Sequence, residues 1–139
     1  MRRLLLVLTA ATIRVSAAAA DPVGDKLIAC APATFDTAVQ CLHDDLPPKT
    51  RAALLKPDGA IRAHLGLGTF LRNEWGLWKG GPLMASLLEI GFRHPDDMSG
   101  AILNAYVARE NGKDFDVRKA AAGSTNYWRD VAAREQSIK

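Results

Sequence analysis

The chain has 139 residues, 48% of them hydrophobic and 24% charged, which suits one small globular core and excludes a wholly disordered protein. Residues 1–20 contain three basic side chains and no acidic one, so the formal net charge of +3 falls to zero in the remainder. A neutral domain lacks the basic face that nucleic-acid binding requires, and we expect no nucleic-acid partner.

Residues 1–20 have the pattern of a secretory signal peptide. Arg2 and Arg3 precede an apolar run, and Ala18-Ala19-Ala20 supplies the small-residue cleavage motif. The run is too short to cross a bilayer core of about 30 Å, so we expect no transmembrane segment. These features predict a protein that is exported to the periplasm or secreted, with a mature chain that begins at Asp21.

Cys30 and Cys41 are the two cysteines of the chain. An even count in an exported protein favours a disulfide, and so short a loop would contribute about 2–3 kcal/mol to stability. An alternative remains open, because Leu27-Ile28-Ala29-Cys30 is similar to a bacterial lipobox, in which Cys30 carries a lipid. Charged residues between this motif and the apolar run argue against lipidation.

The first half of the mature chain is expected to contain a leader and a short helix. Residues 21–33 are rich in proline and glycine and predict an irregular leader. Thr34 is a good N-cap for a helix over 35–42, which the Pro47-Pro48 pair keeps short. A helical turn is expected over 49–56.

A central helix is expected over 60–75, where apolar residues recur every three or four positions. We expect it to be the most buried helix. Gly66 and Gly68 cost about 1 kcal/mol each there, which points to close approach by another backbone. Gly76 ends the helix, and Leu77-Trp78 should turn back onto the core.

Two further core helices and a weaker segment follow. One is expected over 83–90, and another begins at Pro95 and ends at Asn111-Gly112. The buried stripe of the latter is predicted to be Met98, Ala101, Ile102, Ala105 and Tyr106. The tail, 113–139, is weakly specified, with a fifth helix anchored by Tyr127, Trp128 and Val131. The sequence therefore predicts an all-α single-domain bundle of about four core helices over 34–112.

Two blocks stand out, Gly68–Trp78 and His94–Ser99. Together they resemble the signature of a bacterial family known as a domain of unknown function, in which an Arg-Asn-x-aromatic-Gly-Leu-Trp stretch precedes a His-Pro-Asp-Asp helix start. The resemblance covers about Thr34 to Asn111. It implies a compact helical domain and brings no activity with it.

The two blocks predict a candidate polar cluster with two neighbouring tryptophans. Its members are Arg72, Asn73, Glu74, His94, Asp96 and Asp97, beside Trp75 and Trp78. If the two helix ends meet, Arg72 pairs with Asp96 or Asp97, with His94 nearby as an acid–base group. A metal site is the weaker interpretation, because three of the ligands crowd into one helical turn.

A structural interpretation of the same residues carries more weight. Acidic residues after proline are what helix capping and the helix dipole select, and an arginine paired with one of them would lock two helices together. Nucleophile and phosphate-loop motifs are missing from the sequence, so we expect no catalytic residue, cofactor or metal. The leading hypothesis is a non-catalytic protein-binding or scaffold module. A hydrolase centred on the His-Pro-Asp-Asp segment and a structural envelope protein are the alternatives, and the oligomeric state stays open.

Overall fold

A computed structural model describes residues 22–138, and the regular elements of this range are all helical. The expected signal peptide lies outside the described residues. The elements are α1 (Pro22–Cys30), α2 (Phe35–Asp45), α3 (Pro48–Leu54), α4 (Gly59–Arg62), the π-helix η1 (His64–Gly68), α5 (Thr69–Glu74), α6 (Pro82–Ile90), α7 (Pro95–Glu110) and α8 (Val117–Gln136). The predicted all-α class is confirmed.

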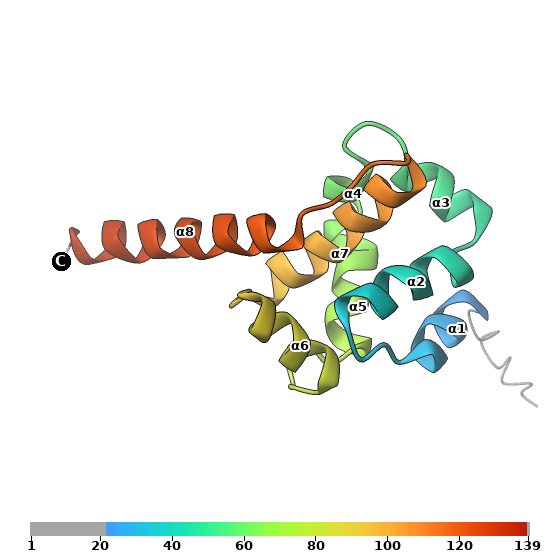
Figure 1. Cartoon of the computed structure of the whole chain (residues 1–139), viewed down its shortest axis with the longest axis horizontal. Helices are drawn as coiled ribbons and strands as arrows, with labels where there is room; N and C mark the ends of the chain where they lie inside the picture. Colours follow the sequence, from blue (N-terminus) through green and yellow to red (C-terminus); the bar gives the residue numbers. More distant parts are fainter. Residues whose placement is uncertain (1–21, 139) are drawn as a thin grey trace, which may run out of the picture.

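The helix that organises the core is α7. It runs through the middle of the helical body and contacts α2, α4, η1, α5 and α8 (Figure 1). The residues predicted to form its buried stripe are buried, and so are three others, Pro95, Ser99 and Leu103. The buried residues of α7 are Pro95, Met98, Ser99, Ala101, Ile102, Leu103, Ala105 and Tyr106. The most buried helix is therefore α7 and not the segment 60–75.

The expected continuous helix over 60–75 is divided in the structure into α4, η1 and α5. Ile61 and Leu65 lie outside the core, with 72% and 83% of their surfaces exposed. The π-turn changes which residues face inward, because it contains more residues per turn than an α-helix. At Gly68 an added Cβ would lie 3.2 Å from Nη1 of Arg72, so here the glycine does allow a close approach, although to a side chain. Gly66 has open space around it.

Helix ends follow local capping rules. The Thr34 side chain accepts a hydrogen bond from the backbone N–H of Thr37, and the Thr37 hydroxyl accepts one from Thr34, which is a capping box. Proline occupies the first turn of α6 and of α7. Gly112 has a φ of 65° after α7, a conformation that glycine adopts without strain. These local predictions are confirmed.

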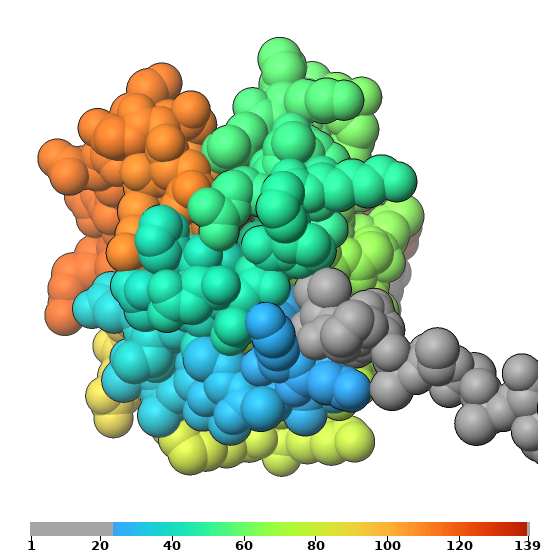
Figure 2. Space-filling model, turned by 90° about the vertical axis from the view of Figure 1, so that its right-hand side faces the viewer, coloured from blue at the N-terminus to red at the C-terminus, as the bar shows by residue number. Residues whose placement is uncertain are grey.

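The expected irregular leader is instead helical over α1. Leu27 is buried, and its carbonyl oxygen accepts a hydrogen bond from Nε1 of Trp75 at 2.8 Å. A disulfide joins Cys30 to Cys41 with 6.1 Å between the α-carbons, and α1 lies against α2 (Figure 2). Tertiary contacts therefore stabilise a helix that the local sequence disfavours. Because the Cys30 sulfur is bonded to Cys41, it is not free to carry a lipid.

Removing the disulfide should lower the free energy of unfolding by about 2–3 kcal/mol, because the cross-link restricts the unfolded chain. The test is urea unfolding of the protein and of a Cys30→Ala/Cys41→Ala variant, each with and without reductant. The reductant should shift the midpoint of the parent protein and leave that of the variant unchanged. Equal midpoints for the oxidised parent and the variant would contradict a stabilising role.

The helix α8 extends away from the rest of the molecule (Figure 1). Asp116 caps its first turn, and Ala121 is its buried residue. The tail that the sequence specified weakly is thus a helix of 20 residues. Within the described range, no helix combines the length and apolar character needed to cross a membrane.

Candidate functional site

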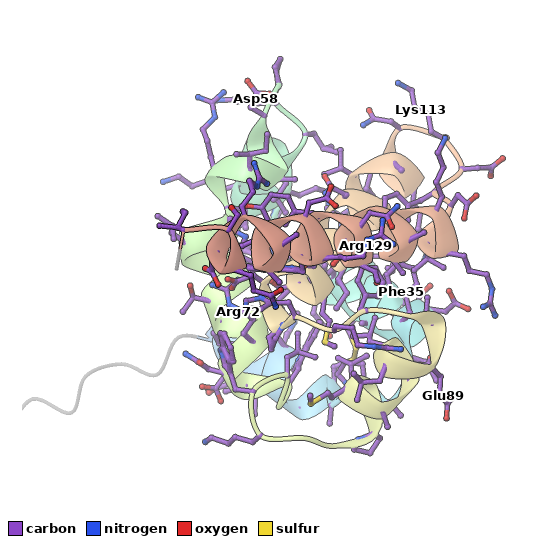
Figure 3. The ribbon with its side chains drawn as sticks, turned by 90° about the vertical axis from the view of Figure 1, so that its left-hand side faces the viewer. Phe35, Asp58, Arg72, Glu89, Lys113 and Arg129 are labelled. Atoms are coloured by element: carbon purple, nitrogen blue, oxygen red, sulfur yellow. A yellow bond between two sulfur atoms is a disulfide. The ribbon has the colours of Figure 1, made fainter. Side chains whose placement is uncertain are left out.

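Five of the residues singled out in the sequence lie at the N-terminus of α7, where α5, η1 and α8 also approach; they are Arg72, Trp78, His94, Asp96 and Asp97. We call the whole group of residues at this place the α7 cap cluster. It comprises His64, Arg72, Trp78, His94, Asp96, Asp97, Ser99, Ser124 and Trp128. In Figure 3, Arg72 is labelled on the body below α8, and Arg129 is labelled on α8 itself.

Arg72 is enclosed by the chain, with 6% of its side chain exposed. Its Nε lies 3.0 Å from Oδ1 of Asp96, an ion pair without a well-directed hydrogen bond. Nη1 donates to the Ser99 hydroxyl at 2.8 Å, and Nη2 donates to the Thr69 hydroxyl at 2.9 Å and more weakly to the His64 carbonyl. The guanidinium group is therefore occupied within the fold, where it joins α5 to α7.

Asp97, the other carboxylate considered as a partner of Arg72, binds α8 instead. Its Oδ2 accepts hydrogen bonds from the Ser124 hydroxyl and from Nε1 of Trp128, both at 2.5 Å. Hydrogen bonds to a charged acceptor are stronger than those between neutral groups. The two adjacent aspartates thus hold two different helices. Sequence reasoning missed Ser124, although its spacing of four residues from Trp128 places both on one helical face.

His94 forms the N-cap of α7. Its Nδ1 accepts a hydrogen bond from the backbone N–H of Asp96 at 3.2 Å, which requires an unprotonated Nδ1. Its ring stacks on Trp128, with 4.5 Å between centroids, and meets the edge of Trp78 at 6.0 Å. The imidazole is thus a structural link between α7 and α8.

The other predicted members lie elsewhere. Asn73 and Glu74 are exposed, and Trp75 belongs to the core through its hydrogen bond to α1. Trp78, which was expected to turn onto the core, is 52% exposed, whereas its neighbour Leu77 is buried. In residues 22–138 there is no group of three His, Cys, Asp or Glu side chains placed to hold a metal ion.

An open hollow of about 450 Å³ lies beside the α7 cap cluster, between α7 and α8. We call it the α7–α8 hollow. Its polar and aromatic lining includes His64, Asp96, Asp97, Asn104, Ser124 and Tyr127. The volume falls within the range of small-ligand sites, which is roughly 300–1,000 Å³.

A second polar cluster joins α2, α3 and α7 and was missed in the sequence. Nδ1 of His43 lies 2.5 Å from Oε1 of Glu110, and Arg51 lies 3.7 Å from the other carboxylate oxygen. Arg51 also donates to the His43 carbonyl at 2.6 Å. The hydroxyl of buried Tyr106 has no hydrogen-bond partner among the described residues. No local signal connects residues that are 67 positions apart.

Tyr106→Phe should make stability less sensitive to alkaline pH. Burial, and secondarily the negative charge of Glu110, raise the pKa of Tyr106 above its ordinary value, while Arg51 opposes this shift. The unfolded chain then loses the phenol proton first, so stability is complete below about pH 10 and falls as the pH rises further.

Urea unfolding between pH 8 and pH 11 tests this expectation. Below pH 9 the variant should equal or exceed the parent by up to about 1 kcal/mol, because an unpaired buried hydroxyl is costly. Tyr127→Phe, at an exposed position, is the matched control and should keep the alkaline loss. An identical alkaline loss in the Tyr106 variant would contradict the assignment.

Comparison with known proteins places the chain in a family without an assigned activity. A family model described as Domain of unknown function (DUF6794) matches residues 31–109. Comparisons with curated proteins and with solved structures give no significant match. The match covers more than half of the chain, which therefore belongs to this family.

Proposed function

We propose that this member of the DUF6794 family is an exported, non-catalytic helical module that binds another protein through α8. The observation that carries the proposal is the exposure of α8. Most of this 20-residue helix faces solvent, and its far end extends beyond the body (Figure 1). A helix without tertiary packing is only marginally stable in water, so a covering partner would add to its stability.

The α7 cap cluster supports this function because it fixes the direction of α8. Asp97 holds two side chains of α8 through hydrogen bonds, and His94 stacks on one of them, Trp128. Arg72 and Asp96 pair with each other, and Asp97 accepts hydrogen bonds from α8, as expected of a scaffold. The polar side chains of the two sequence blocks then serve to position one helix for recognition.

Export is supported by two features. Residues 1–20 have the composition of a signal peptide, and the Cys30–Cys41 disulfide is of a kind that persists in oxidising compartments. We propose a periplasmic or secreted location on these grounds.

Photo-crosslinking in the producing cell tests the proposal. A photoreactive residue replaces Asn126 or Ala133, both exposed on α8, or Lys49, exposed on α3, which serves as the matched control. We expect a discrete protein adduct from the two α8 positions, with a yield at least tenfold above that from position 49. Equal yields from all three positions, or no adduct from α8, would overturn a protein-binding role for this helix.

A further inference from the structure

We propose that the α7–α8 hollow receives a basic side chain, arginine in preference to lysine, from the polypeptide partner. This inference rests on the proposed function and adds the chemistry of the partner. Three features of the hollow carry it: unused space, an uncompensated negative charge and an exposed aromatic ring.

The space is provided by two glycines inside helices, Gly100 of α7 and Gly123 of α8, which both line the hollow. Glycine is among the least favourable residues in a helix interior. A Cβ added at either position would meet nothing within 4 Å, so packing within the chain does not require these glycines. We infer that the room is used by an occupant from outside the chain.

The charge of the hollow selects a cation. Asp96 is paired with Arg72, but Asp97 accepts hydrogen bonds only from neutral donors among the described residues. The lining contains no lysine or arginine, and His64 is its single titratable base. The Asp97 carboxylate therefore has no cationic side-chain partner in this open hollow, where a cation with directed donors is the complementary ligand.

The aromatic ring favours a guanidinium group. Tyr127 lines the hollow and is 56% exposed, so much of its side chain is accessible to a ligand. A planar guanidinium stacks on aromatic faces and donates to a carboxylate at the same time, whereas an ammonium group is a more strongly hydrated point charge. Asp97 and Tyr127 together fit the arginine side chain.

The test is an NMR titration of the ¹⁵N-labelled full mature chain with blocked amino acids. The probe is Nα-acetyl-arginine-N-methylamide, and its neutral counterpart is the corresponding citrulline derivative. We expect the arginine probe to shift the amide signals of Gly100, Gly123 and Ser124 and to bind at least tenfold more tightly than the citrulline probe. Equal affinities, or no shifts at these residues, would overturn the proposal.

Matched variants locate the binding. Gly123→Leu fills the hollow and should weaken arginine binding at least tenfold, whereas Ala133→Leu, elsewhere on α8, should leave it unchanged. Equal effects of the two variants would overturn the assigned place. Agmatine, a free amine with the same guanidinium group, is the second probe. If agmatine binds tenfold more tightly than blocked arginine, the occupant is a free amine, and the polypeptide assignment is overturned.

This titration separates the two proposals. Crosslinking from the outer face of α8 requires no cation in the hollow. Adducts without probe binding would overturn the arginine site alone, while probe binding without adducts would overturn the protein-binding function and leave the cation preference of the hollow established.

Discussion

Arg72→Ala should lower the free energy of unfolding by about 3 kcal/mol, because it leaves Asp96 without its cation and breaks the contacts between α5 and α7. Removing one partner of a buried ion pair costs about 3–5 kcal/mol. We expect the lower end of this range, since the Asp96 side chain keeps 37% of its surface exposed and water solvates part of the remaining charge.

Urea unfolding followed by circular dichroism measures this loss. Arg62→Ala is the matched control, because Arg62 is exposed and its side chain contacts the Pro57 carbonyl. It should change stability by less than about 0.5 kcal/mol. The double variant Arg72→Met/Asp96→Asn removes both charges and should recover part of the loss. An unchanged free energy of unfolding in the Arg72→Ala protein would contradict a stabilising role for this guanidinium group.

Asp97→Ala should detach α8 from the body while α1 to α7 stay folded. The substitution removes the acceptor for Ser124 and Trp128, and hydrogen bonds to a charged group contribute about 1.5–3 kcal/mol each. With Ala121 as the one buried residue of α8, few apolar contacts remain to hold the helix in place. We expect a loss of about 3 kcal/mol in the free energy that docks α8.

Hydrogen exchange and limited proteolysis measure this detachment. Amide protection should fall across residues 117–136 and stay unchanged in α7, and a protease should cleave first within α8. Asp130→Ala, at an exposed position of the same helix, is the matched control and should leave protection unchanged. Unchanged protection in the Asp97 variant would contradict the role of this carboxylate as the anchor of α8.

The α7 cap cluster shows how far residue patterns predict a site. The two sequence blocks grouped Arg72, His94, Asp96 and Asp97; in the structure Asp96 lies beside Arg72 and His94, whereas Asp97 binds α8. Asn73 and Glu74 were included because they are neighbours of Arg72, yet adjacent helical residues point in different directions and these two face solvent. Thr69 and Ser99 lie within the two blocks but were not predicted to belong to the polar cluster, and Ser124 lies outside the blocks. A hydroxyl group in a sequence does not indicate which residue it will bind.

Two predictions about the helices were also wrong, each because of a feature that appears only in the tertiary structure. The expectation of a single buried helix over 60–75 was wrong because apolar spacing assumes an uninterrupted α-helical turn, which η1 does not have. The expectation of an irregular leader was wrong because contacts with the rest of the fold stabilise α1, through the Cys30–Cys41 disulfide and the burial of Leu27.

By itself, the amino-acid sequence determined the all-α class, the N-cap at Thr34, the start of α7 at Pro95, and a cysteine pair suited to a disulfide. Capping depends on groups within one helical turn, so it can be recognised locally. Tertiary structure alone decided which aspartate meets Arg72 and where α8 is held. Those contacts join residues 24 to 31 positions apart in the chain, and their geometry exists only after the helices have packed around α7.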